Sequence, residues 1–465
     1  MNKRNIGIIY TVAVFIVLAA FDNIIIGLFP PLFSSISKDL NIPLSALGFV
    51  SAANILVTSI SSVYWGYLAG KFKRKTLIIV GTIFWAVSVY LTSLSRTYYQ
   101  LLFFQIFTGI GLGCIASIGF SVLTDYIPQK FRGMLLSLWG MSQGFGGIAG
   151  ALIASLIATS SNWRKPFEIV SYIGFLLIIL YLFVKEPKKG GAEPELKKLI
   201  NSGYEYNYSI ELKQVYKIAS KNSNILLFLQ GLFMNITTGS LIWLPTLYIS
   251  KIYQQGYSMK TAIIASGYLY GIFQLGGMTS GFFGYLGDRF QRKSYRGRAL
   301  LTSFFVFITA PIYAAMFIIP MKNLMLPNDG NAYSIFLALL KQIALNHWMT
   351  ALFILSLLAS AAQSANTPNW LALITDVNLP EHRGTAFSAA NLSNSIGRTF
   401  GNVGVAFLLG IVSQYTGEPN SYIITLITLQ MFLIPSALCY VRMARTNIID
   451  IRNVKTTLRK RANET

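Results

Sequence analysis

The sequence predicts an all-α integral membrane protein, with twelve transmembrane helices arranged as two six-helix bundles. Of its 465 residues, 54% are hydrophobic and 12% are charged, whereas about 25% of the residues of a soluble domain are charged. Apolar runs of about twenty residues, the length that an α-helix needs to cross a hydrocarbon core ~30 Å thick, recur along the whole chain. The basic residues alternate between the two sides of these runs. These three observations place the chain in a lipid bilayer.

The apolar runs are long and almost free of charge. The first, residues 6–33, is interrupted only by Asp22 and Asn23, and residues 76–95 and 299–320 contain no charged side chain. About twelve segments of this kind follow one another, and each is predicted to be a membrane-spanning helix.

The net charge of +22 is divided unequally between the two sides of the predicted spans. If the amino terminus is cytoplasmic and every run spans once, the cytoplasmic segments contain 29 of the 38 Lys and Arg residues and the opposite side contains 8. This alternation follows the positive-inside rule. It predicts a multi-pass protein of the cell membrane with both termini in the cytoplasm, and it accounts for the charge without nucleic acid as a partner.

A hydrophilic stretch divides the chain into two halves. Residues 185–223 contain eight Lys together with Pro and Gly, the composition of a cytoplasmic linker. We therefore predict an amino-terminal bundle in residues 1–185, a linker in residues 186–222, a carboxy-terminal bundle in residues 223–445 and a basic cytoplasmic tail in residues 446–465. The tail is expected to contact the head groups of anionic membrane lipids.

An internal repeat relates the two halves. The segment GYLAGKFKRK, from Gly66, and the segment GYLGDRFQRK, from Gly284, are identical at six of ten positions with an offset of 218. TDYIPQKFRG, from Thr124, and TDVNLPEHRG, from Thr375, share four residues at an offset of 251. The 33 additional residues of the second half are expected in an external loop within residues 321–347. Two copies that enter the membrane from the same side predict a repeat axis along the membrane normal.

Glycines continue the repeat into the following helices. The offset of 251 pairs Gly146 with Gly397 and Gly150 with Gly401. Small residues four positions apart let helix backbones approach closely in lipid. We expect these glycines to lie at a helix contact in each half.

The two basic loops resemble the loop signature of the major facilitator superfamily, in which Gly, Leu, Asp, Arg and a basic pair recur after the second and the eighth helix. The second copy matches this signature, whereas the first has Gly70 in place of the Asp. GMSQGFGGIAG, from Gly140, and WRKPF, from Trp163, are similar to the fifth-helix and sixth-helix motifs of the same superfamily. The resemblance covers residues 5–445 and implies two bundles around a central cavity.

The resemblance also implies that the loops act as gates, although loops that only set the topology are the alternative. The gating residues implied are Gly66, Arg74, Lys75, Asp125, Arg132, Gly284, Asp288, Arg289, Arg292, Lys293, Asp376 and Arg383.

Two charged residues lie deep inside predicted spans, Asp22 in the first and Arg398 in the eleventh. Intramembrane charges are costly and are therefore functional hypotheses. The architecture that the resemblance implies would place them opposite each other across the cavity. Asp22 would then couple transport to protons as Arg398 moves toward it or away from it, and Arg398 would suit an anionic substrate. A static buried pair, or two separate charges in a water-filled cavity, is the alternative.

Polar and aromatic residues on the other cavity helices form a candidate substrate site. They are Gln105, Asn235, Thr238, Trp243, Tyr268, Gln274, Gln363 and Asn366. Each alone is more often explained by packing. Gln105 stands where many superfamily members carry a fourth-helix Arg. A first-helix Asp is similar to that of the Spinster-like lipid transporters, but their fourth-helix charges are absent from residues 98–123, so the branch is not assigned.

The sequence therefore predicts a monomeric secondary transporter that moves a small organic solute by alternating access, with protons as the coupling ion and without a cofactor. Two His and no phosphate-cradling loop argue against an enzyme or a primary pump. Cys114 and Cys439 lie in apolar runs and indicate neither a disulfide nor a metal site. A uniporter and a non-transporting receptor of the same fold are the alternatives.

Overall fold

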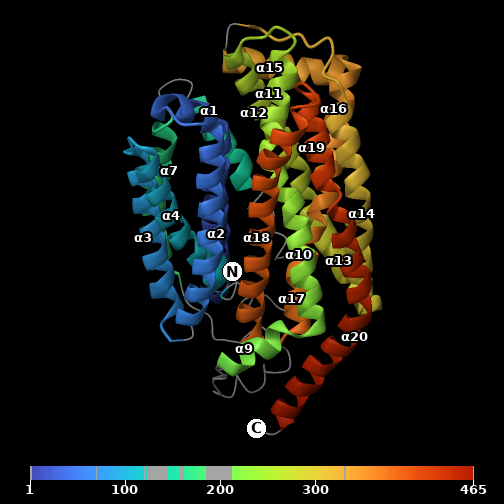
Figure 1. Cartoon of the computed structure of the whole chain (residues 1–465). Helices are drawn as coiled ribbons and strands as arrows, with labels where there is room; N and C mark the ends of the chain where they lie inside the picture. Colours follow the sequence, from blue (N-terminus) through green and yellow to red (C-terminus); the bar gives the residue numbers. More distant parts are fainter. Residues whose placement is uncertain are drawn as a thin grey trace.

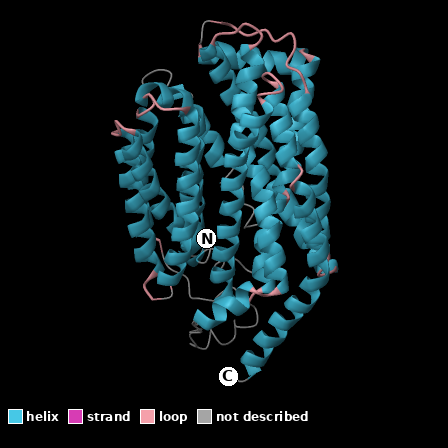
Figure 2. Cartoon of the chain, in the orientation of Figure 1, coloured by secondary structure: helices cyan, strands magenta, loops and turns pink. Residues whose placement is uncertain are grey.

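Lipid offers no hydrogen-bond partner to a peptide group, so a chain that crosses it must satisfy its backbone internally, as helices do. The computed structural model describes residues 3–69, 71–119, 122, 125, 142, 145–154, 156–157, 162–184, 212–328 and 331–463. Every regular element within these residues is a helix (Figure 2). The predicted fold class, an all-α membrane protein, is confirmed.

The helices follow the chain in the order that the two-bundle prediction requires (Figure 1). The first half contains α1 (Lys3–Leu40), α2 (Leu44–Leu68), α3 (Arg74–Ser93), α4 (Tyr98–Cys114) with the π-helical turn η1 (Ile115–Gly119), the short helix Phe145–Ala154, and α7 (Lys165–Leu182). The second half contains α9 (Leu212–Ala219), α10 (Asn222–Ser240), η3 (Leu241–Trp243), α11 (Leu244–Tyr253), α12 (Met259–Leu275), η4 (Gly276–Thr279), α13 (Ser280–Lys293), α14 (Gly297–Ile318), α15 (Ala332–Leu345), α16 (His347–Ser364), α17 (Asn366–Val377), α18 (Pro380–Val412), α19 (Asn420–Gln430) and α20 (Leu433–Asn463).

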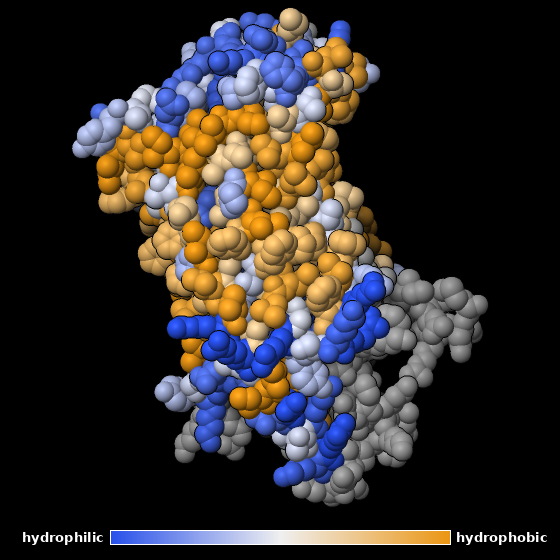
Figure 3. Space-filling view, turned by 90° about the vertical axis from the view of Figure 1, so that its right-hand side faces the viewer, coloured by the Kyte–Doolittle hydropathy of each residue, from blue (hydrophilic) through white to orange (hydrophobic). Residues whose placement is uncertain are grey.

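An apolar belt crosses one face of the molecule. Figure 3 shows it on the face formed by the second half, between hydrophilic surfaces at the two ends of the molecule. By length and composition, 10 described helices are able to cross a membrane. Residues 259–293 form a further continuous helical stretch through α12, η4 and α13. The count of twelve spans stays a prediction.

The repeated glycines lie at equivalent helix contacts in the two halves. A methyl group built on Gly146 or Gly150 would lie 2.1 Å and 2.3 Å from the carbonyl oxygens of Ala20 and Ile24 in α1. On α18, the same construction at Gly397 and Gly401 gives 2.2 Å and 1.9 Å to carbonyl oxygens of α10, the first long helix of the second half. Backbone therefore touches backbone at these positions, and only glycine fits.

Small polar residues join the two halves along α2 and α18. At one end of this seam the side-chain amide of Asn402 donates to the carbonyl of Gly48 (3.3 Å). In the middle, the hydroxyls of Ser59 and Ser395 form a short hydrogen bond. At the other end, a methyl group on Gly66 would lie 3.3 Å from the hydroxyl of Ser388. We call these contacts the α2–α18 seam.

An ion pair joins the end of α1 to the residues just before α7. The carboxylate of Asp39 pairs with Arg164 (2.9 Å) and accepts a hydrogen bond from the indole of Trp163 (3.1 Å). These two bonds hold the pKa of Asp39 below its usual value. The contact therefore stabilises the fold above the ordinary pKa of an Asp and is lost as the pH falls through the depressed value.

The segment expected as an external loop, residues 321–347, contains a helix. Residues 332–345 form α15, which packs against α12 and α16. The expectation of a loop rested on the insertion alone and ignored the apolar side chains within it. Ile335 and Leu339 are buried in this contact.

We predict that Gly401→Ala destabilises the protein by about 1–3 kcal/mol, because overpacking at a backbone contact forces α18 and α10 apart. Gly410→Ala on the same helix is the matched control, because a methyl group there meets nothing within 4 Å. Thermal unfolding of the detergent-purified variants, followed by tryptophan fluorescence, measures both. Equal melting temperatures for the two variants would disprove the backbone contact.

Candidate functional site

The predicted gate of the first half is an ion pair between two helices. Arg74, the first residue of α3, is 3% exposed and bonds Asp125 at 2.8 Å. The neighbouring Lys75 donates to the carbonyl of Leu182 at the end of α7 (2.5 Å). The pair forms although Gly70 replaces the Asp of the loop signature. Asp125 therefore supplies the carboxylate in this half.

The second half has a corresponding cluster with one more carboxylate. Arg298, near the start of α14, bonds Asp288 of α13 at 2.7 Å and lies 3.9 Å from Asp376 of α17. Asp376 is the repeat equivalent of Asp125 at the offset of 251. Each half therefore joins an Arg near the start of one helix to the Asp of the repeated Thr-Asp segment, and Asp288 adds a closer carboxylate in the second half.

The other predicted gating residues lie around these pairs. Arg383 is buried and donates to the carbonyl of Thr375 (3.1 Å), and Arg292 donates to the carbonyl of Asp288 (3.3 Å). Arg289 and Lys293 are exposed, and Gly284 is buried. Gly66 lies in the α2–α18 seam. Arg132 lies outside the described residues.

Asp22 lies in the interior of the first half. One oxygen of its carboxylate, Oδ1, is buried and has no hydrogen-bond partner. Cys114 of α4 is close enough to interact with its charge. Asp22 is flanked by Ala20 and Ile24, the residues whose carbonyls touch Gly146 and Gly150. Its position is therefore set by a close contact between helix backbones.

Arg398 lies in the second half, half-buried on α18. Its backbone is held against Gly239 of α10, where a methyl group would lie 2.1 Å from its carbonyl oxygen. Tyr270 of α12 is close enough to interact with its charge, and Gln274 lies beside the Tyr270 hydroxyl. Among the described residues, neither Arg398 nor Asp22 forms an ion pair. The two charges have separate neighbours in this structure.

Two of the predicted substrate residues, Gln105 and Asn366, belong to hydrogen-bond networks, each of which lies within a single half. Gln105 is buried in the first half, where its side chain accepts from Asn54 (3.3 Å) and donates to Thr92 (3.1 Å). Asn366 accepts from Gln230 and Tyr440, both at 2.8 Å. These contacts join helices, which is the packing role that each residue alone would have.

The remaining predicted substrate residues lie in the second half. Asn235 donates to the carbonyl of Gly231 in its own helix (2.9 Å), and Gln363 donates to Thr238 (3.2 Å). Trp243 donates to Asn402 (2.8 Å), at the end of the α2–α18 seam. Tyr268 donates to the carbonyl of Ala332 in α15 (3.2 Å). The structure therefore gathers Tyr270, Gln274 and Arg398 and leaves Tyr268 at the periphery.

Sequence reasoning missed several residues of these clusters. Arg298 follows the basic pair of the second loop by a few residues, so the sequence alone indicates for it only a contribution to the positive-inside pattern. Tyr270 lies among apolar residues, and Asn402 lies four residues after Arg398 on the same face of α18. That spacing was a signal for Asn402, whereas Tyr270 had none.

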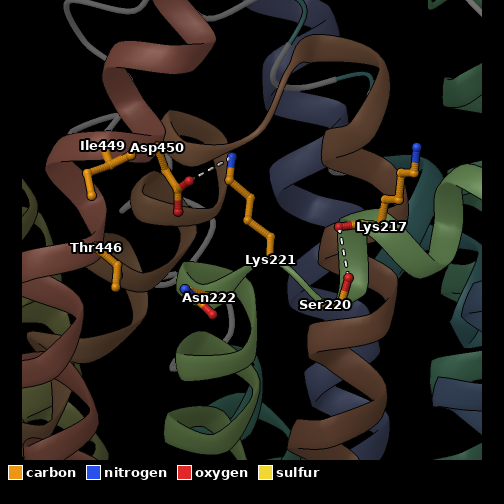
Figure 4. Close-up of a pocket in the computed structure, with 7 residues that line it drawn as sticks. All are labelled: Lys217, Ser220, Lys221, Asn222, Thr446, Ile449 and Asp450. Atoms are coloured by element: carbon orange, nitrogen blue, oxygen red, sulfur yellow. Dashed lines mark hydrogen bonds and ion pairs between the residues drawn. The ribbon is translucent and has the colours of Figure 1, made fainter.

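A separate pocket of about 420 Å³ lies where α9, the start of α10 and α20 meet (Figure 4). Lys221 extends toward Asp450, 3.6 Å away, and donates to the carbonyl of Val377. Burial lowers the pKa of Lys221, and Asp450 partly offsets that effect. Lys217 and Ser220 line the same pocket from α9. The pocket ties the end of the linker to α20 and is distinct from the residues around Arg398.

Comparison with known proteins agrees with the fold described above. A family model described as Major Facilitator Superfamily matches residues 12–328. The benzoate transport protein of Acinetobacter baylyi is 23% identical over 60% of this chain and 63% of its own length. Protein spinster of Drosophila melanogaster is 22% identical over 34% of this chain and 27% of its own length. The chain thus spans less than two thirds of the length of these curated relatives.

A solved structure extends the fold comparison to the whole chain. A bacterial homologue of the human lysosomal transporter Spinster, in an inward-facing and occupied conformation, superposes with a TM-score of 0.63 at 17% identity. The match covers 97% of this chain and 98% of that one. It shows a shared fold.

We predict that Asp288→Asn lowers the stability by about 3 kcal/mol, because it leaves the buried Arg298 without its close partner. Asp376→Asn, which removes the carboxylate at 3.9 Å, is the matched control and is expected to cost less, because the attraction between two charges weakens with distance. Thermal unfolding in detergent measures both. A larger loss for Asp376→Asn would show that the pairing is assigned to the wrong carboxylate.

Proposed function

The chain belongs to the major facilitator superfamily, and from this premise we propose that it is a proton-coupled secondary transporter of a small organic anion. Asp22 is the proton-coupling residue, and Arg398 is the residue that binds the anionic group. The single observation that supports this best is that Asp22 and Arg398, each deep inside a predicted span of its own half, form no ion pair among the described residues.

The surroundings of Asp22 support a role in proton binding. A carboxylate with a buried oxygen that accepts no hydrogen bond is costly in its charged form, whereas water that reaches this oxygen stabilises the charge. A cavity that alternates between dry and hydrated states would therefore load Asp22 with a proton and release it. A static buried pair with Arg398, one of the alternatives from the sequence, is absent from this structure.

The surroundings of Arg398 support a role in anion binding. A guanidinium presents five donors in a fork that matches a carboxylate or a phosphate. Tyr270 and Gln274 lie nearby and add polar groups that orient a bound anion. An aromatic carboxylate such as benzoate is one member of this substrate class. Arg398 forms no ion pair among the described residues, so the negative charge that pairs with its guanidinium comes from the substrate.

The α2–α18 seam supports alternating access. Its hydroxyl and amide groups form hydrogen bonds between the halves, and interhelical hydrogen bonds in membranes are worth about 0.6 kcal/mol each. The two halves can therefore rock against each other at low cost while the glycine contacts keep each half rigid.

We predict that Asp22→Asn abolishes proton-driven uptake into proteoliposomes and retains exchange of internal for external substrate. An amide cannot carry the proton, but substrate binding does not need one. Asp39→Asn removes a carboxylate outside the spans and is the matched control, which retains both activities. Loss of exchange in Asp22→Asn would argue against a role limited to coupling.

We predict that organic anions raise the melting temperature of the purified protein and that Arg398→Ala eliminates this effect. Ligand at ~100 times its dissociation constant adds ~2.7 kcal/mol of stability. Arg452→Ala, which removes an exposed guanidinium from α20, is the matched control and keeps the shift. The panel contains organic acids, sugars, amino acids, nucleosides and lysolipids. A shift with neutral solutes alone, retained in Arg398→Ala, would reject the anion-binding role.

A further inference from the structure

Helix α15 carries apolar side chains on two opposite faces. Ile335 and Leu339 are buried, where α15 packs against α12 and α16. Phe336, Leu337 and Leu340 are 38%, 46% and 45% exposed, and the ring of Phe336 also lies beside Tyr268 of α12. Residues three and four apart share one face of a helix, so these three side chains form a continuous stripe. We call it the α15 stripe.

Polar residues occupy a third face of α15. Ser334 and Lys341 are seven residues apart and therefore lie above one another, beside the stripe. Lys341 is exposed. One face of α15 thus contacts the bundle, the next is apolar, and the third carries Ser334 and Lys341, with the exposed Leu345 at the end of the helix. A helix that lies in the boundary between head groups and acyl chains has this division, and a Lys at its edge extends its ammonium to the head groups.

Specific contacts hold α15 in place. The side chain of Asn331 caps its amino terminus by accepting from two backbone amides. Tyr268 of α12 donates to the carbonyl of Ala332 (3.2 Å), and its ring centroid lies 5.2 Å from that of Phe336. At the other end, the amide of Asn346 donates to the carbonyl of Lys322 (2.9 Å). The exposure of the stripe is therefore a property of a fixed helix.

The helices that α15 contacts also expose apolar side chains. Met259 of α12 and Ile354 and Leu358 of α16 are 48%, 49% and 52% exposed. Trp348 lies in the first turn of α16, and Trp is enriched where a membrane meets water. With 14 residues, α15 is too short to span the bilayer. It lies at the end of the molecule opposite α9 and the carboxy terminus (Figure 1).

We propose that α15 is an interfacial helix that inserts Phe336, Leu337 and Leu340 among the acyl chains of the lipid leaflet at that end, with Lys341 at the head groups. Tyr268 joins α15 to α12, the helix that carries Tyr270 beside Arg398. The lipid contact thereby holds the anion-binding side of the protein at a fixed depth while the other half moves.

The test measures the depth of a fluorescent label on each face of α15. Leu340→Cys and Lys341→Cys are made in the otherwise native chain, because Cys114 and Cys439 are buried and the unsubstituted protein gives the labelling background. Each variant is labelled with bimane and reconstituted in phosphatidylcholine vesicles. Nitroxide lipids labelled near the glycerol backbone are expected to quench the label at residue 340 several times more strongly than the label at residue 341. Aqueous iodide is expected to show the reverse preference.

Three results would overturn the proposal. Equal quenching of both labels by iodide would place the stripe in water. Stronger quenching by nitroxides at the chain ends would place α15 in the bilayer interior. Protection of residue 340 from both quenchers, with cysteine cross-links between two copies, would identify a second copy as the occupant. Leu337→Cys repeats the measurement on the same stripe, and the melting temperature of each labelled variant checks its fold.

Discussion

Direct contact between two helix backbones in each half is the constraint on which the rest of the structure depends. In lipid no hydrophobic force draws helices together, so close packing has to do so. Gly146 and Gly150 meet α1 on either side of Asp22, and Gly397 and Gly401 meet α10 on either side of Arg398. The two intramembrane charges therefore lie on the stiffest parts of their halves. When the two halves rock against each other, each charge therefore keeps its position within its own half.

Both halves contain this backbone contact, but the Arg–Asp clusters at one end of the two halves differ. Arg74 and Asp125 form the pair of the first half, and Arg298 has the same relation to Asp376 in the second. Asp288 takes over as the close partner of Arg298, whereas Gly70 stands at the corresponding place in the first half. The second half thus has one carboxylate more than the first, so breaking the two ion-pair clusters requires different free energies.

Periodicity and spacing predicted what depends on neighbours along the chain. The all-α membrane fold, the glycine contacts and the carboxylates near the basic loops followed from apolar runs and repeated segments. Contacts between distant helices did not. Nothing in the spacing indicated that Gln105 binds Asn54 and Thr92 within its own half, or that Arg298 joins two carboxylates. The lack of pairing between Asp22 and Arg398 depends on how the two halves meet, which no local pattern encodes.

The α2–α18 seam has a thermodynamic consequence. Opening an apolar interface exposes hydrocarbon to water and raises the heat capacity, whereas opening a polar one lowers it slightly. The seam presents the hydroxyls of Ser59, Ser388 and Ser395 and the amide of Asn402, all of which water can solvate at once. Separation of the halves along this line therefore carries little heat-capacity change. The enthalpy difference between the joined and the separated states of the seam therefore stays nearly constant with temperature.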